Sequence, residues 1–182
     1  MSLIDSSYFI HDINIPTGQF SDLQGFINRY EPEILTDLLG YELAKEVIAY
    51  DAETSPQRII DLVEGKEYTV KANGGRDQLI KWGGLINSEK KSLIAYYVYY
   101  WYMRAKATHT ATVGEVKRKG ENSVNAEQNA KIMNAWTRML TLFGYCGQAN
   151  TEPSALNFLD ANAADYPEWM FTPRGSVNAF DL

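Results

Sequence analysis

Residues able to do acid–base or nucleophilic chemistry are few in this chain, and they stand apart. The two histidines, His11 and His109, are distant in sequence, and neither has a partner at the i, i+4 spacing of a helical metal site. His109 could act as a base, but no nucleophile or orienting acid accompanies it. The single cysteine, Cys146, excludes an intramolecular disulfide and makes no metal site alone. We therefore expect no catalytic residue, no metal and no cofactor.

The glycine pairs and the charge clusters favour turns and solvated surfaces. Glycines at 74–75 and 83–84 lack the Lys-Ser/Thr that follows in a phosphate-binding loop. With 23 acidic residues in the chain, neighbouring acids arise by composition and do not indicate a glycosidase. The only concentrated positive charge is Lys117-Arg118-Lys119, which lies between two glutamates. Two interpretations stay open for it, a solvated loop tip and a contact with an acidic partner or a phosphate backbone.

An aromatic segment at 93–103 carries no charged residue and predicts a helix that is apolar on every face. Asn87 or Ser88 is the expected cap. Such a helix must be enclosed, either by its own domain or by a neighbouring subunit. Tyrosine combines a large contact area with a hydroxyl that needs a partner, which favours an interface. The expected subunit interface consists of Tyr96, Tyr99, Tyr100 and Met103.

The periodicity of the rest predicts further helices and one hairpin. Helices are expected at 21–39 (restarting at Pro32), 41–50, 56–64 and 126–143, with a short one after Pro153. Residues 68–71 and 79–82 predict a β-hairpin with an Asn-Gly turn. The polar, β-branched stretch 108–124 predicts either an exposed hairpin or a long loop, and long loops in compact domains usually have a function.

These elements predict one mainly α domain, a small helical bundle around the central aromatic helix. An extended N-terminal arm at 1–19 and a C-terminal arm at 146–182 flank a helical domain at 20–145, with 108–124 as its inserted loop or hairpin. The tail is too aromatic for a solvated end, so we expect it to dock on a partner. The docking residues expected there are Trp169, Met170, Phe171, Arg174, Phe180 and Leu182.

Charge and hydropathy exclude several classes of protein. A net charge of -6 argues against a dedicated nucleic-acid binder, which usually carries a basic face. The N-terminus lacks the basic-then-apolar pattern of a signal peptide, so we expect synthesis in the cytoplasm. The uncharged aromatic stretch is about half the roughly 20 residues that a bilayer span requires. We therefore expect no contact with a membrane.

Short segments between roughly residues 20 and 145 resemble the head–tail connector (adaptor or neck-ring) proteins of tailed bacteriophages. They are most similar to those of phages of Bacteroidetes, including crAss-like phages. The segments that carry this resemblance are Leu-Leu-Gly-Tyr-Glu-Leu at 38–43, Trp-Gly-Gly-Leu at 82–85, Ser-Leu-Ile-Ala-Tyr-Tyr-Val-Tyr-Tyr at 92–100, Gly-Glu-Val-Lys at 114–117 with Glu-Asn-Ser at 121–123, and Ala-Trp at 135–136. All are packing and turn signatures, with no catalytic fingerprint among them.

The resemblance implies a non-enzymatic virion protein of the phage neck. It implies a ring of identical subunits, commonly a dodecamer, beneath the portal protein, with DNA passing through the lumen without specific binding. Extended termini would contact the portal and other neck or tail proteins. The inserted loop, with Val113, Lys117, Arg118 and Lys119, would face the lumen or a partner. The small hairpin at 68–82 departs from the simplest connectors of this kind.

Two other functions stay open on the sequence. One is a small cytoplasmic enzyme, hydrolase-like, with a site near His109. The other is a tail-completion factor that binds its partners as a monomer or dimer. The first lacks a nameable nucleophile, base and orienting group. The second shares the apolar termini but predicts no ring.

Overall fold

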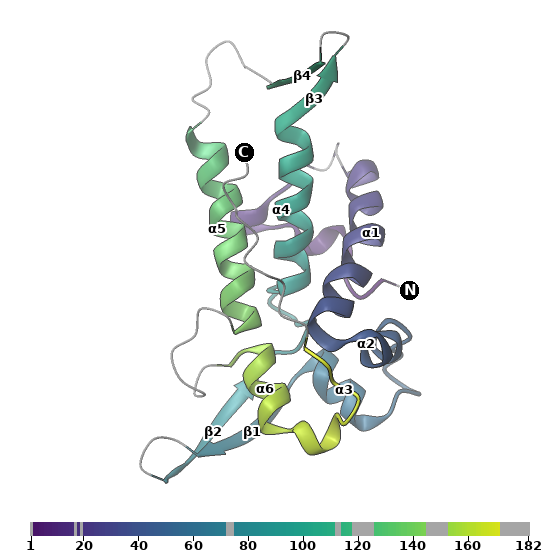
Figure 1. Ribbon diagram of the computed structural model, residues 1–182, viewed down its shortest axis with the longest axis vertical. Coiled ribbons are helices and arrows are strands. Elements are labelled where there is room, and N and C mark those ends of the chain that lie inside the picture. The colour runs from purple at the N-terminus through teal and green to yellow at the C-terminus, as the bar shows by residue number, and fades with distance from the viewer. Residues whose placement is uncertain are drawn as a thin grey trace.

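Three long helices lie side by side in the computed structural model of the chain (Figure 1). The structure describes residues 2–16, 18, 20–71, 75–111, 114–117, 126–144 and 153–171. Helix α4 (Leu93–Ala107) runs between α1 (Phe20–Leu39) and α5 (Ala126–Phe143). At one end of the molecule lie α2 (Tyr41–Ile48), α3 (Gln57–Glu64), α6 (Ala155–Ala161) and the hairpin of β1 (Lys66–Lys71) and β2 (Asp77–Trp82). The expected mainly α fold is confirmed.

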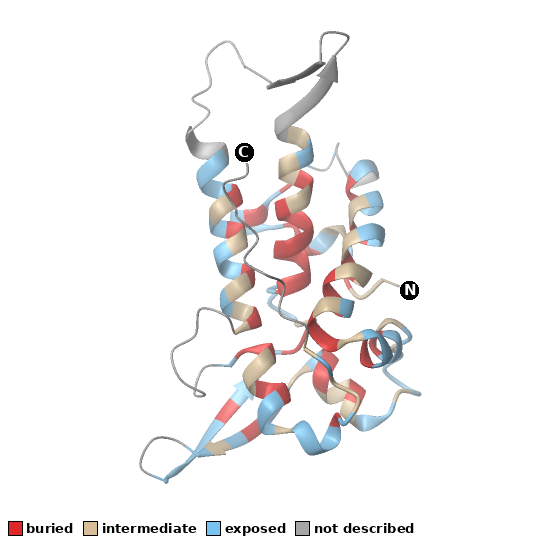
Figure 2. Ribbon diagram, viewed as in Figure 1, coloured by how far each residue is buried: buried red, intermediate tan, exposed pale blue. Residues whose placement is uncertain are grey.

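Helix α4 forms the centre of the core, and its buried residues run without interruption from Leu93 to Tyr100 (Figure 2). The helix begins later than the expected caps. The side chain of Asn87 is used within the preceding loop, where its Oδ1 accepts a hydrogen bond from the Lys91 amide at 3.0 Å. Ser92 is the actual cap, since its Oγ accepts from the amide of Ile94 at 3.2 Å. The expectation of Asn87 or Ser88 as cap is therefore wrong.

Helix α1 continues through Pro32, where the sequence predicted a restart. A proline inside a helix removes one backbone hydrogen bond and costs about 3 kcal/mol. Leu23 and Ile27 before Pro32, and Leu35 and Leu38 after it, are all fully buried. Each such burial contributes about 1.5–3 kcal/mol, so four of them outweigh the proline and hold the helix as one element.

The first hairpin, β1 (Lys66–Lys71) with β2 (Asp77–Trp82), is confirmed as an antiparallel pair. Its expected Asn-Gly turn falls outside the described residues. The end of β2 is attached to α3 by the Trp82 indole, whose Nε1 donates to the Leu62 carbonyl at 2.9 Å. The amide of Ile86 likewise donates to the Val63 carbonyl at 2.9 Å. The hairpin is therefore a rigid extension of α3.

The N-terminal segment packs on the helices instead of extending as an arm. It forms two 3-10 turns, Ser6–Tyr8 and His11–Ile13. Its large apolar side chains are buried in the main core, and they are those of Ile4, Tyr8, Phe9, Ile13 and Ile15. A segment with so many apolar groups gains more by covering the helices than by remaining extended. Through residue 16 the expected N-terminal arm is part of the body of the domain.

The second hairpin and the C-terminal elements complete the fold. Strands β3 (Thr108–Ala111) and β4 (Gly114–Lys117) pair antiparallel directly after α4, at the opposite end of the molecule from β1–β2 (Figure 1). Of the two structures expected at 108–124, the described residues 108–111 and 114–117 form the hairpin, and the rest of that stretch lies outside the described residues. Helix α6 begins at its cap Ser154, whose Oγ accepts from the Asn157 amide. A final 3-10 turn, Ala163–Asp165, leads to the tail.

Candidate functional site

The face of α4 expected to meet a neighbouring subunit is covered by the chain itself. Tyr96, Tyr99 and Tyr100 are 8%, 2% and 1% exposed, and Met103 is half-buried. The Tyr100 ring lies 4.6 Å from that of Trp136 on α5. These three tyrosines therefore offer almost no surface to another subunit, and the expectation of an interface there is corrected. Of the two enclosures left open by the sequence, the structure has the single domain.

The hydroxyl groups of three tyrosines on α4, which are Tyr96, Tyr97 and Tyr100, form hydrogen bonds within the domain. Tyr96 Oη donates to the Asp12 carboxylate at 3.1 Å, and Tyr97 Oη donates to Glu33 at 2.8 Å. Arg104 donates to the hydroxyl of Tyr100 at 2.8 Å. A buried phenol needs such a partner. The many tyrosines of α4 are thus explained by their hydrogen bonds, which join α4 to the N-terminal segment and to α1.

Tyr96 gives the stability a predictable dependence on alkaline pH. Burial, and then the nearby Asp12 carboxylate, raises the pKa of Tyr96 from 10.0 to about 12. Because the folded protein favours the neutral phenol, Tyr96 makes its full contribution to the free energy of unfolding below pH 10. This contribution is lost between pH 10 and about 12, at about 1.4 kcal/mol per pH unit. We expect Tyr96→Phe to make urea-unfolding free energy fall less steeply across this window than it does in the wild type. Equal slopes in both proteins would contradict the assignment.

The first part of the expected docking tail is attached to its own chain. The Trp169 indole Nε1 donates to the Leu38 carbonyl at 3.1 Å, and the Met170 amide donates to the Leu39 carbonyl at 3.3 Å. These carbonyls belong to the last turn of α1, which has no intrahelical donors for them. Phe171 packs on Phe143, with ring centroids 5.4 Å apart. Trp169 and Phe171 therefore contribute to the fold, and because both are only half-buried, the expectation that they dock on a partner stays a prediction.

An ion-pair cluster around Arg58 on α3 also holds the tail. Its guanidinium donates to Glu46 on α2 at 2.7 Å and pairs with Glu168 in the tail. Hydrogen bonding to Glu168 and the charges of both carboxylates raise the pKa of Arg58. Tyr166 Oη donates to the backbone carbonyl of Arg58 at 2.7 Å. One side chain thus joins α2, α3 and the tail, and nothing in the local sequence around Arg58 indicated it.

An exposed apolar patch, formed by Tyr41 and Met170, lies at the junction of α1 and α2. Tyr41 is 68% exposed and Met170 is 70% exposed. The backbone of Met170 passes Gly40, the residue before Tyr41, where an added Cβ would lie 3.0 Å from the Met170 carbonyl oxygen. Gly40 has a φ of +78, a conformation that favours glycine. Among the expected docking residues that the structure describes, Met170 is the most exposed, and the sequence did not indicate Tyr41.

The other predicted site residues are placed only in part. Lys117 is the last residue of β4, whereas Val113, Arg118 and Lys119 lie outside the described residues. Arg174, Phe180 and Leu182 of the tail also lie outside them, as does Cys146. His109 is in β3, where its backbone pairs with Val116.

Two classes of site are absent from the part of the chain that the structure describes. No three of its histidine, cysteine and acidic side chains gather in a cluster suited to a metal ion. Within the same residues, none of the helices has the length and hydropathy needed to cross a bilayer. Within the described part of the chain, surfaces suited to contact a partner include the Tyr41–Met170 patch, the β1–β2 hairpin and a pocket beside the N-terminal segment.

Comparison with known proteins gives a family but no activity. A family model described as a family of unknown function (DUF6712) matches residues 35–139 and 152–179, which together are more than half of the chain. No curated protein and no solved structure gives a significant match.

Proposed function

We propose that the chain, which belongs to the DUF6712 family of unknown function, is a structural head–tail connector of a bacteriophage neck. Its subunits would form a ring beneath the portal protein, dock further neck or tail proteins and let DNA pass through the lumen. Under this proposal the protein belongs to the virion and has no enzymatic activity. The resemblance of five short segments between residues 20 and 145 to connector proteins supports the proposal.

The Tyr41–Met170 patch is the observation on which the proposal rests most. Single exposed apolar residues are ordinary, but tyrosine and methionine are both enriched at protein interfaces, and these two are exposed at one junction of the fold. Met170 is held at this position by backbone attachment to the end of α1, so the patch is preformed. A preformed patch loses less conformational entropy on binding than a mobile one. We assign this patch to the contact with the portal or the next ring.

The shape and charge of the chain are consistent with a ring. A ring needs a heterologous interface, in which one surface meets a different surface of the next copy. The β1–β2 and β3–β4 hairpins project at opposite ends of the helical body and offer two such different surfaces (Figure 1). A net charge of -6 per subunit would repel the DNA backbone, so that the genome slides through the lumen without being held.

The proposed contact is tested by adding charge to the patch. We expect Tyr41→Asp combined with Met170→Asp to abolish co-sedimentation of the chain with the portal protein of the same genome, because a buried unpaired carboxylate is costly. The control is Asn134→Asp, which adds a negative charge at an exposed position of α5 and should leave binding intact. Unchanged binding by the double variant would contradict the assignment of the patch. A wild-type chain that ignores the portal would contradict the proposed function.

A further inference from the structure

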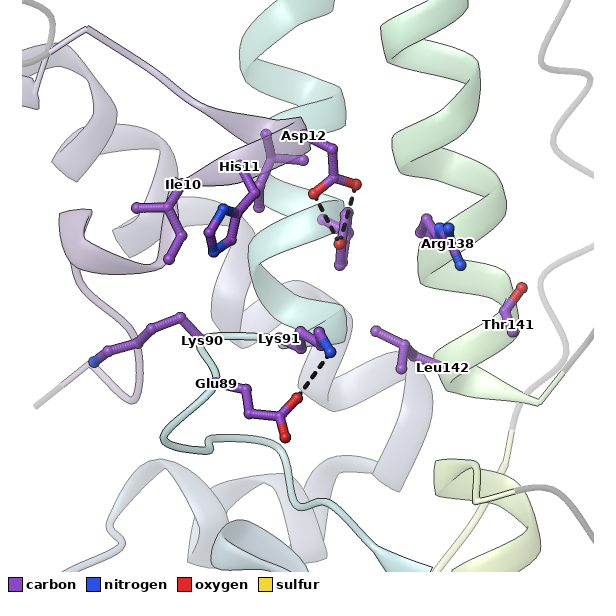
Figure 3. A pocket seen from close by; sticks show the side chains of 11 residues that line it. Ile10, His11, Asp12, Glu89, Lys90, Lys91, Arg138, Thr141 and Leu142 are labelled. Atoms are coloured by element: carbon purple, nitrogen blue, oxygen red, sulfur yellow. Dashed lines mark hydrogen bonds and ion pairs between the residues drawn. The ribbon is translucent and has the colours of Figure 1, made fainter.

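A pocket of about 460 Å³ lies where three segments distant in sequence meet (Figure 3). Its walls come from the N-terminal segment at 10–13, from the loop before α4 at 89–91, and from α5. A volume in this range suits a small ligand or a few residues of a peptide. No part of the proposed connector function described above uses this pocket.

The backbone on two sides of the pocket is in an uncommon conformation. His11 has a φ of 56 and Lys90 a φ of 58, and they are the two non-glycine residues with positive φ in the described part of the chain. Both line the pocket. Such backbone is costly for residues with a Cβ and tends to gather at binding sites. The buried neighbours of His11, Phe9 and Ile13, hold the turn in place.

Of the cations that line the pocket, Arg138 is the one with neither an ion pair nor a ring contact among the described residues. Lys91 Nζ is paired with Glu89 at 2.8 Å, and Lys90 Nζ lies 4.5 Å from the centre of the Tyr8 ring. The Asp12 carboxylate accepts the hydroxyl of Tyr96. Arg138, on the α5 wall opposite Asp12, makes no hydrogen bond or ion pair with any described residue (Figure 3). An arginine placed in this way offers a fork of donors to a carboxylate.

The pocket also has apolar walls. Ile10 is 36% exposed, and Leu142 lies half-buried below Arg138 on α5. Ile13, which is buried, also lines the pocket. A ligand that fits this pocket therefore combines a carboxylate with large apolar groups on either side of it.

We propose that this pocket binds an acidic peptide segment, and that its occupant is the sequence Phe-Asp-Leu at 180–182 of a second copy of the chain. Asp181 would meet Arg138, and the two flanking side chains would cover Ile10 and Leu142. Eleven residues follow Phe171 in the sequence, and in extended form they span about 36–40 Å. That length lets a tail that leaves one subunit at Phe171 reach a neighbour. The inference rests on the proposed function, since it supplies a contact between neighbouring copies.

The pocket is tested by peptide binding to the full chain. The probe is a fluorescent peptide with the sequence of residues 172–182, and the readout is its anisotropy. We expect Arg138→Glu to weaken binding by at least about tenfold. Lys131→Glu is the control, because it makes the same charge change at an exposed position of α5 that does not line the pocket. A peptide that carries Asp181→Arg should not bind the wild-type chain, and its binding should be restored by the Arg138→Glu variant. Absence of binding, or equal binding by Arg138→Glu, would overturn the proposal.

A second readout separates this inference from the proposed function. Sedimentation velocity of Arg138→Glu and of the wild type, each with the portal protein, reports the assembly. We expect Arg138→Glu to reduce the ring fraction and Lys131→Glu to leave it unchanged. A ring that forms equally well with Arg138→Glu would overturn this inference and leave the connector function standing. Peptide binding in a chain that stays monomeric with the portal would overturn both the contact between copies and the connector function.

Discussion

Gly84→Ala is expected to lower the free energy of unfolding by about 3–5 kcal/mol, a large part of the 5–15 kcal/mol typical of a domain. Gly84 has a φ of +82, which an alanine adopts only with strain. Its added Cβ would also lie 2.5 Å from the Val63 carbonyl oxygen, and backbone atoms there have no room to move. In thermal unfolding this should appear as a decrease in Tm of roughly 10 °C.

The neighbouring glycine provides a matched control. An added Cβ at Gly83 would have Asn87 Nδ2 as its nearest atom, at 4.0 Å, which is ordinary contact. We therefore expect Gly83→Ala to change the free energy of unfolding by less than about 1 kcal/mol. Gly65, with a φ of +100 and the Trp82 carbonyl against it, should behave like Gly84. Equal effects at Gly83 and Gly84 would contradict the close packing of α3 on the end of β2.

The second large effect is expected at Glu31, a buried carboxylate that holds the N-terminal segment. Glu31 is 4% exposed and accepts three hydrogen bonds, from Ser2 Oγ at 2.7 Å and from the amides of Leu3 and Ile4 at 2.9 and 3.2 Å. We expect Glu31→Ala to cost about 2–4 kcal/mol, because it removes a charged acceptor and leaves buried amides unpaired. Hydrogen exchange at Leu3 and Ile4 should accelerate with it.

Two variants make the test at Glu31 specific. Glu31→Gln keeps one carbonyl acceptor and should retain part of the stability and of the amide protection. Glu53→Ala removes an exposed carboxylate and should leave both unchanged. If Glu31→Ala unfolds no more easily than Glu53→Ala, the N-terminal segment is not held by this carboxylate.

Elements with a strong period were predictable from the sequence. Ile132, Ala135, Met139 and Phe143 form the one-sided stripe of α5, and all four are buried. The β1–β2 hairpin and α6 follow from equally local signals, β-branched residues for the first and Pro153 followed by apolar residues for the second. In these cases residues close together in the sequence determine the local structure, so composition and spacing are sufficient to predict it.

The surfaces were less predictable, because they depend on contacts between distant residues. The aromatic pattern of α4 shows that the helix must be covered, but it does not say by what. Tyr96 is covered by Asp12, a residue 84 positions away in sequence. The roles of Glu31 and Arg58 arise in the same way: Glu31 binds the N-terminal segment 28 positions away, and Arg58 binds Glu168 in the tail, 110 positions away. Tyr41 is 68% exposed although the tail attaches to Leu39, two residues before it.

Native mass spectrometry of the full chain, alone and mixed with the portal protein of the same genome, tests the central claim most directly. The connector function predicts a closed assembly of one stoichiometry, a whole multiple of 20.6 kDa, formed either alone or only on the portal. The resemblance to connector proteins makes that multiple a dodecamer. A chain that remains a monomer or dimer and does not respond to the portal would contradict the connector function.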